Sequence, residues 1–179
     1  MVKIFSDSTC DLSQELLEKY DISILPLHIL LGEKEYCDGV DITPDEIFQW
    51  SDAQKTTPKT SAPALDMAME MLEPFVKEKQ PVICFSISED MSTSANVMRM
   101  AASELEAEDL VTVIDSASLS TGIGLLVLHA AEMAQAGKTV EEIQTEIEEL
   151  KSKVRASFVV DTLTYLARGG RCSSVTALL

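Results

Sequence analysis

The chain has 179 residues, which is enough for one well-buried domain and part of a second. Thirty acidic residues against fourteen basic ones give a formal net charge of −16, which opposes binding to nucleic acids or to an anionic membrane surface. Its four cysteines show no metal-ligand spacing, no signal-peptide pattern begins the chain, and no apolar run approaches the roughly eighteen residues of a membrane span. We therefore expect a cytoplasmic protein with reduced thiols, no membrane span and no nucleic acid partner.

The first part of the chain combines short strands with a helix and a hairpin. Residues 2–6 predict a strand, and Asp11 with Gln14 predicts a capping box for the helix that follows. The runs 27–31 and 34–37 flank a Gly-Glu pair, which is typical of a hairpin. A hairpin departs from plain alternation of strands and helices, so we expect a local antiparallel element here.

A helix and a polar loop come next. Thr43, Pro44 and Glu46 predict a helix start, with Thr as the cap, Pro at the first helical position and Glu at the third. Residues 54–63 form the clearest predicted loop, because they are dense in Thr, Ser and Pro and carry only two lysines as charges. The hydroxyls of this loop are candidate contacts for an anion, and Pro63 is expected to open the next helix.

The central stretch of the chain passes from an apolar strand through a polar turn into a helix. Residues 82–85 are rich enough in Val and Ile to predict a strand buried on both faces. Ligands of open α/β sheets bind where such strands end, and the free N–H groups of a helix start favour an anion. The alternative, that Ser88 or Ser92 only caps the helix, stays open because serine is a preferred N-cap residue. The hydroxyl-bearing residues of this turn are Ser86, Ser88, Ser92, Thr93 and Ser94.

The remaining elements repeat the strand–helix alternation. A strand is expected at 111–114, and residues 121–135 are apolar nearly all round, which predicts a helix deep in the core. Thr139 with Glu142 predicts a second capping box, for a surface helix with an acidic outer face. Residues 156–161 are expected to form a further strand, followed by a short helix at 162–167 and an apolar tail.

This order of elements predicts an α/β fold with a mainly parallel sheet flanked by helices. We assign residues 1–154 to one α/β domain and residues 155–179 to the beginning of a second. The latter segment is much shorter than the roughly 50 residues that a domain needs. We therefore expect a truncated second domain in this chain.

Few side chains in the sequence support enzymatic chemistry. His28 lies in an apolar strand and His129 in an apolar helix, so each is more simply a hydrogen-bonded core residue than a general base. Gly122 and Gly124 lack the third glycine of a dinucleotide loop and are better explained as packing glycines. The acidic residues of 38–46 lack the glycine and spacing of a calcium loop. We expect no catalytic residue, no metal and no cofactor.

Two further features have both a structural and a functional interpretation. Six of the eight methionines lie between residues 67 and 100, where they either line an adaptable apolar pocket or fill gaps in the core. We favour core filling and keep the apolar pocket as the alternative. Arg168 and Arg171 flank a Gly-Gly pair that either contributes to anion binding or marks the end of a helix.

Five separated strings of the sequence together resemble the DegV family, in order and in spacing. The likeness covers the whole chain, and although no single string is decisive, the five in order make the resemblance specific. The strings are SDSTCDL at 6–12, TSAP at 60–63, SEDMSTS at 88–94, VIDS at 113–116 and LARGGR at 166–171.

The resemblance implies a cytoplasmic, bacterial lipid-binding protein that is not itself an enzyme. Family members serve as the fatty-acid-binding subunit of bacterial fatty acid kinase: they hold a long-chain fatty acid in an apolar tunnel and present its carboxylate to a separate kinase, which makes an acyl phosphate. By position, Thr60 and Ser92 match the family's carboxylate-binding hydroxyls. Ser61 is the neighbour of Thr60, and Arg171 is a secondary candidate for an anion contact.

One departure from the family and one rival function bear on this interpretation. Thr93 stands where the family commonly has glycine, so a backbone conformation that glycine permits is expected to be altered or strained. The family's further carboxylate contact, a histidine, comes from the part of its second domain that this chain lacks. The alternative function is a small α/β phosphate-ester hydrolase or acyl transferase that uses the same hydroxyl-rich turns.

Overall fold

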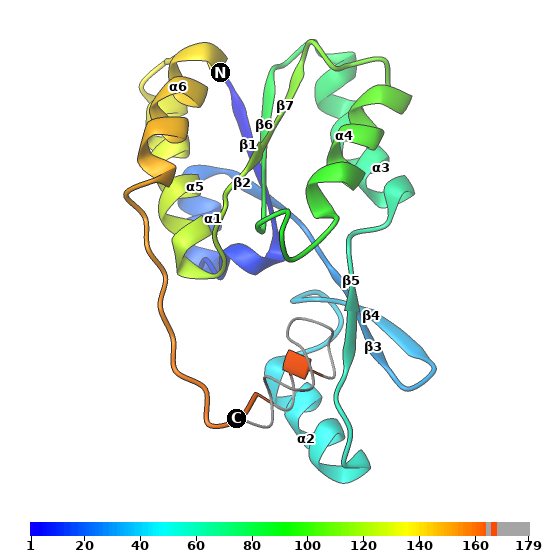
Figure 1. Ribbon diagram of the computed structural model, residues 1–179. Helices are drawn as coiled ribbons and strands as arrows, with labels where there is room; N and C mark the ends of the chain where they lie inside the picture. Colours follow the sequence, from blue (N-terminus) through cyan, green and yellow to red (C-terminus); the bar gives the residue numbers. More distant parts are fainter. Residues whose placement is uncertain (164–165, 168–179) are drawn as a thin grey trace. The chain divides into compact units, whose positions relative to one another are not determined.

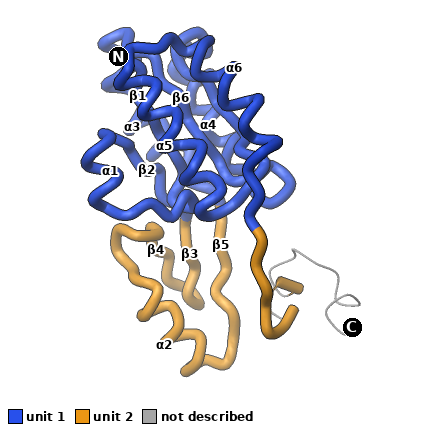
Figure 2. Tube along the Cα trace, turned by 90° about the vertical axis from the view of Figure 1, so that its left-hand side faces the viewer, with its two compact units in different colours: residues 1–27, 62–156 blue, residues 28–61, 157–179 orange. Residues whose placement is uncertain are grey.

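The computed structural model describes residues 1–163, 166 and 167. The chain divides into two compact units, one made of residues 1–27 and 62–156 and the other of residues 28–61 with those from 157 onward (Figure 2). The assignment of residues 1–154 to one α/β domain stays a prediction. That residues 155–179 begin a second domain stays a prediction.

The first unit is built on a four-stranded sheet in the order β2-β1-β6-β7, and all of its strands are parallel (Figure 1). All residues of β1 and of β6 are buried, which explains why the sequence shows them as continuous apolar runs rather than as alternating ones. The predicted parallel sheet is thereby confirmed. Its strands are β1 (Lys3–Asp7), β2 (Ile22–Leu25), β6 (Val82–Ser86) and β7 (Val111–Asp115).

Helices cover both faces of this sheet (Figure 1). On one face, α1 (Gln14–Tyr20), α5 (Thr121–Gln135) and α6 (Val140–Lys151) enclose a core that includes Phe85 and Ile123. On the other face, α3 (Leu65–Lys77) and α4 (Ser94–Glu104) pack on Phe5, Cys84 and Met98. As predicted, α5 is buried along most of its length, with eight buried residues among its fifteen.

The second unit contains an antiparallel sheet in the order β4-β3-β5 and the helix α2. The predicted hairpin is confirmed as β3 (His28–Leu31) and β4 (Lys34–Cys37). Ile29, Leu31 and Ile42 form a small core, against which Trp50 of α2 packs. Helix α2 spans Pro44–Gln54, and β5 spans Lys59–Ser61, inside the segment that the sequence predicts as a loop.

Two of the predicted helix starts are confirmed, and two are wrong. Capping boxes are present at Thr43 and Thr139, as predicted. Asp11, however, has a φ of 51° in the left-handed region and does not cap α1; the cap is Ser13, whose hydroxyl accepts from Leu16 N. Helix α3 begins at Leu65 with Ala64 as its N-cap, so Pro63 lies before the helix rather than in its first turn.

The segment after α6 differs from its predicted form. Residues 156–160 have no secondary structure, and Phe158 and Val159 are exposed, with Val159 at 99%. A strand exists only where a neighbouring strand supplies hydrogen bonds, and residues 156–161 pair with no strand in the part of the chain that the structure describes. The helix predicted at 162–167 lies only partly within the described residues, and Arg168 and Arg171 lie outside them.

Candidate functional site

The candidate site of the first unit is the turn between β6 and α4, at the carboxyl edge of the parallel sheet. This turn is held by the two neighbouring loops: Ile87 N donates to Asp7 Oδ2 at 2.8 Å, Ser88 N to the carbonyl of Ser118 at 3.0 Å, and Glu89 N to Asp115 Oδ1 at 3.2 Å. Because three backbone N–H groups in succession are fixed by loops that follow other strands, the turn is held in position by the sheet.

Asp7 is the buried carboxylate of this edge. Its side chain is fully buried and accepts hydrogen bonds from Ile87 N, from Thr9 N and, at 2.6 Å, from Thr9 Oγ1. Burial raises the pKa of Asp7, while these hydrogen bonds oppose the rise. Asp7 therefore orients the turn rather than binding an anion itself.

Ser92 and Ser94 carry the hydroxyls at the start of α4. Their oxygen atoms lie 2.9 Å apart, and Ser94 N donates to Ser92 Oγ at 3.3 Å. The N-cap of α4 is Thr93, whose side chain makes no capping hydrogen bond, so neither Ser88 nor Ser92 is the cap of this helix. Thr93 has a φ of −93°, which any residue adopts, and the expected strain at this position is absent.

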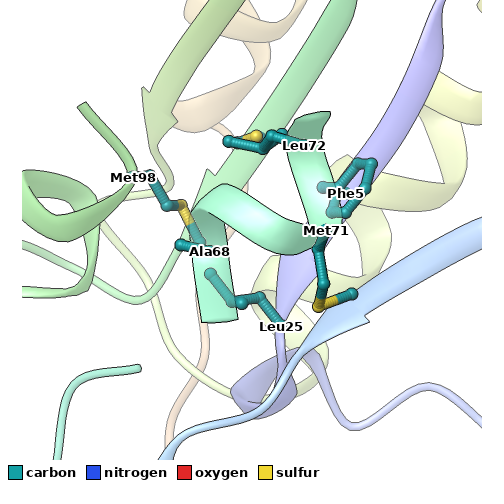
Figure 3. Close-up of a pocket in the computed structure, with 7 residues that line it drawn as sticks. Phe5, Leu25, Ala68, Met71, Leu72 and Met98 are labelled. Carbon is teal, nitrogen blue, oxygen red and sulfur yellow. The ribbon is translucent and has the colours of Figure 1, made fainter. Parts of the chain in front are cut away.

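A small apolar cavity lies on the face of the sheet that α3 and α4 cover (Figure 3). Its volume is about 10 Å³, roughly the room for one water molecule. Burial raises the pKa of the Cys84 thiol to about 12, so this side chain is neutral and contributes an apolar wall. The cavity is lined by Phe5, Leu25, Ala68, Met71, Leu72, Cys84 and Met98.

Helix α4 connects the hydroxyls with the cavity. Ser94 and Met98 are separated by one helical turn, so their side chains lie on the same side of the helix, and both residues are buried. Ser86 makes a second connection, because it follows Cys84 by two residues on β6 and therefore projects to the same face of the sheet. Its hydroxyl is buried and has no hydrogen-bond partner among the described residues.

The predicted residues Thr60 and Ser61 belong to the second unit, where both are exposed on β5. In the register with β3, Thr60 is opposite Ile29 and Ser61 is opposite His28. Successive residues of a strand project to opposite faces, so these two hydroxyls do not lie on the same face of the sheet. The fourth predicted residue, Arg171, lies outside the described residues.

The two histidines are each paired with a glutamate. His28 is on β3, with Nδ1 2.7 Å from Glu35 Oε1, and is the hydrogen-bonded residue that the sequence predicts. His129 is on α5, with Nε2 3.7 Å from Glu146 Oε1. Its side chain is 41% exposed, so the expectation of a core histidine is wrong for His129.

The surroundings of the site are polar and mixed in charge. Arg99 of α4 forms an ion pair with Glu89, which places one cation beside the turn. Among residues 1–163 with 166 and 167, no group of three or more metal-ligating side chains is gathered. None of the helices in the same part of the chain has the length and apolar character that a membrane crossing requires.

A family model described as "Uncharacterised protein, DegV family" matches residues 1–179. This chain belongs to the DegV family. A DegV domain-containing protein of Clostridium perfringens is 38% identical over 177 residues, which cover 99% of this chain and 63% of that protein. A DegV domain-containing protein of Listeria innocua is 35% identical over 179 residues, again covering 63% of its length. The chain thus spans less than two thirds of the DegV relatives that it matches.

Solved DegV structures share the fold. A fat acid (stearic acid)-binding protein from Eubacterium ventriosum matches 98% of this chain and 61% of its own, with a TM-score of 0.86 and 38% identity. DegV, a fatty acid binding protein from Bacillus subtilis, matches 99% of this chain and 63% of its own, with a TM-score of 0.89 and 29% identity. A fatty-acid-binding DegV protein from Thermus thermophilus has a TM-score of 0.85 and 32% identity. The structural neighbours are therefore fatty-acid-binding DegV proteins with the same α/β fold.

Sequence reasoning missed two features of the site. It did not predict that the Asp7 carboxylate is buried and accepts a hydrogen bond from the β6–α4 turn. It also missed the pairing of His28 with Glu35. The pairing of His28 with Glu35 could have been predicted. In a hairpin with a two-residue turn, the alternation along each strand shows which residues share one face.

Proposed function

We propose that this chain binds a long-chain fatty acid, with the acyl chain in an enlarged form of the apolar cavity and the carboxylate at the Ser92 turn. The observation that carries this proposal is helix α4, which bears Ser94 at its first turn and Met98 in the cavity wall one turn later. A polar end and an apolar channel on one rigid element suit a ligand that has a charged head and an apolar tail. The fatty-acid-binding structural neighbours support the same class of ligand.

The apolar part of the ligand supplies most of the binding free energy. Burying one methylene group contributes about 0.8 kcal/mol, whereas a hydrogen bond to a charged group contributes about 1.5–3 kcal/mol. A cavity of about 10 Å³ holds no acyl chain, so side chains of its wall must move when the ligand enters. Met71 and Met98 suit this role because methionine is unbranched and adopts many rotamers at little cost.

The hydroxyls set the orientation of the ligand. We assign the carboxylate contacts to Ser92 and Thr60, with Ser61 and Arg171 as weaker contacts. The buried Ser86 hydroxyl, which lacks a partner among the described residues, marks a place that a polar ligand group completes. In this arrangement the protein supplies binding and orientation and performs no chemistry.

We further propose that the bound carboxylate is the acceptor in acyl phosphate formation by a separate kinase in the cytoplasm of a bacterium. Among the described residues, His28 and His129 are paired with Glu35 and Glu146 rather than with a hydroxyl of the Ser92 turn. This pairing supports a carrier over a hydrolase or transferase, because a serine nucleophile requires a neighbouring base. Incubating the purified chain, ATP and the fatty acid with and without the kinase tests this role. Acyl phosphate formed only with both proteins is the expected result, and turnover by the chain alone would establish the enzyme instead.

The binding proposal is tested by native mass spectrometry of the purified 179-residue chain, followed by denaturation and lipid analysis. We expect a fatty acid to be released. Ser92→Ala should weaken binding of added stearate about tenfold to hundredfold, since it removes a hydrogen bond to a charged group. Ser103→Ala, an exposed serine of the same helix, is the matched control and should leave binding unchanged. A chain that neither carries nor binds a fatty acid would contradict the proposal.

A further inference from the structure

Ser92 and Ser94 form a hydrogen-bonded pair at the start of α4. Their hydroxyl oxygens lie 2.9 Å apart, and Ser94 N also donates to Ser92 Oγ at 3.3 Å. Ser94 is fully buried, whereas Ser92 is half-buried. Within the described part of the chain, Ser92 is the one hydrogen-bond partner of the Ser94 hydroxyl. Ser92 is therefore the member of the pair that a ligand reaches.

The burial of Ser94 determines the direction of this hydrogen bond. A serine hydroxyl has one proton to donate and two lone pairs with which to accept. If Ser94 only accepted, its own proton would be buried without a partner, which costs free energy. Ser94 therefore donates to Ser92 Oγ, in addition to the hydrogen bond from Ser94 N. Both lone pairs of Ser92 are then occupied, and Ser92 can only donate its own proton to a further group.

A separate observation indicates that a polar ligand group reaches this place. Ser86 is fully buried, and its hydroxyl has no hydrogen-bond partner among the described residues. Retaining such a hydroxyl costs free energy unless a ligand group satisfies it. Ser86 belongs to β6, the strand that leads into the turn before α4.

The geometry of β6 and α4 places Ser86 opposite the start of the helix. Cys84 of β6 and Met98 of α4 line the same cavity. Since α4 connects the parallel strands β6 and β7, it runs in the direction opposite to β6. The step from Cys84 to Ser86 advances about 6.6 Å along the strand. The step back from Met98 to Ser94 covers about 6 Å along the helix, so Ser86 and Ser94 lie at the same level.

We propose that Ser94 is a positioning residue that makes Ser92 a pure hydrogen-bond donor and so selects ligands with an ionised carboxylate. This inference rests on the fatty acid binding proposed above and assigns to that site a residue that determines head-group specificity. A carboxylate only accepts hydrogen bonds, which matches the single donor of Ser92. A fatty alcohol carries a proton that finds no acceptor on Ser92, and its neutral hydrogen bond from Ser92 is about half as strong.

Ser94 acts on the ligand through Ser92. The hydrogen bond from the Ser94 hydroxyl polarises that of Ser92 and strengthens its donation to the ligand. In a Ser94→Ala variant, Ser92 Oγ has a free lone pair, and its proton is no longer restricted to the outward direction. A residue that acts only through another has no effect once the second residue is removed, so the two substitutions should not be additive.

The test is a double-mutant cycle of Ser94→Ala and Ser92→Ala, measured with two probes of equal chain length, stearate and 1-octadecanol. Affinities are obtained by displacement of a fluorescent fatty acid that is calibrated for each variant. Ser94→Ala should weaken stearate binding about fivefold to tenfold and change octadecanol binding by less than about twofold. In the Ser92→Ala background, Ser94→Ala should weaken stearate binding by less than about twofold.

Ser103→Ala, at an exposed position of the same helix, is the matched control and should leave both affinities unchanged in either background. Thermal unfolding of each variant shows whether it is folded. Three results would overturn the inference and leave the fatty acid proposal intact: an unchanged stearate affinity in Ser94→Ala, an equal loss for both probes, or additive losses in the cycle. A wild-type chain that binds no stearate would overturn both.

Discussion

Two glycines of α5 show how single residues determine the packing in the first unit. A Cβ atom at Gly124 would lie 2.8 Å from the backbone carbonyl of Cys10. A Cβ atom at Gly122 would lie 2.2 Å from the Ser118 hydroxyl, which belongs to a side chain that can rotate. At Gly124 the helix therefore approaches the backbone of another segment more closely than a residue with a side chain permits. The interpretation of these residues as packing glycines is confirmed.

Gly124→Ala should destabilise the protein by about 1–3 kcal/mol, the usual range for overpacking in a core. The reason is that the new methyl group meets a backbone carbonyl, which cannot rotate away. Gly122→Ala is the control and should cost less, because Ser118 can change its rotamer. Urea unfolding monitored by circular dichroism measures both free energies. Equal losses in the two variants would contradict the distinction between a backbone and a side-chain contact.

At the scale of elements, the capping hydrogen bonds at a helix start are made between residues close together in the sequence. In α6, Glu142 N donates to Thr139 Oγ1 at 3.3 Å, and Thr139 N donates to Glu142 Oε2 at 2.9 Å. The pKa of Glu142 is lowered first by its hydrogen bond with Lys138 and then by that with Thr139 N. Because the folded pKa is the lower one, the carboxylate stabilises the fold above its ordinary value of 4.5, and this contribution is lost as the pH falls through the folded pKa.

Thr139→Ala should therefore lower the free energy of unfolding by about 1 kcal/mol at neutral pH, within the range of about 0.5–2 kcal/mol for lost N-caps. The substitution leaves one backbone N–H of the first turn without its acceptor. Thr139→Ser retains the hydroxyl and should stay within a few tenths of a kcal/mol of the wild type. Denaturant titrations of the three proteins provide the comparison. A similar loss in the serine variant would point to the methyl group rather than to the cap.

At the scale of the whole molecule, the two units differ in the size of their apolar cores. In the described residues, the first unit has clusters of fifteen and eleven buried apolar residues on the two faces of its sheet. The corresponding cluster in the second unit has three, namely Ile29, Leu31 and Ile42. Since the free energy of local opening increases with the apolar area that opening exposes, the second unit is expected to open more easily.

Amide hydrogen exchange should therefore be faster in β3 than in β1 and β6. The amides of Ile29 and Leu31 are expected to exchange through local opening, and those of Ile4 and Ile83 only through global unfolding. Exchange measured by mass spectrometry on short peptides distinguishes the two strands. Equal protection would show that the small core of the second unit opens only together with the rest of the chain.

Much of the fold was predictable, because its signals lie within short segments. Buried parallel strands appear as apolar runs, capping boxes at Thr43 and Thr139 mark helix starts, and the Gly-Glu pair marks a hairpin. Errors arose where a partner distant in sequence decides the outcome. Strand β5 exists because its backbone pairs with β3, whereas the apolar residues 156–161 have no strand partner among the described residues.

The candidate site was likewise predictable only in part. The sequence by itself determined the hydroxyl-rich turn at Ser92, the acidic charge and the family resemblance, because each depends on residue types and their order along the chain. Only the tertiary structure decided that Asp7 is buried beneath that turn, that Met71 and Met98 share a cavity, and that His28 lies opposite Ser61. Burial, shared cavities and strand register are properties of segments that meet across the fold, and a single segment does not contain them.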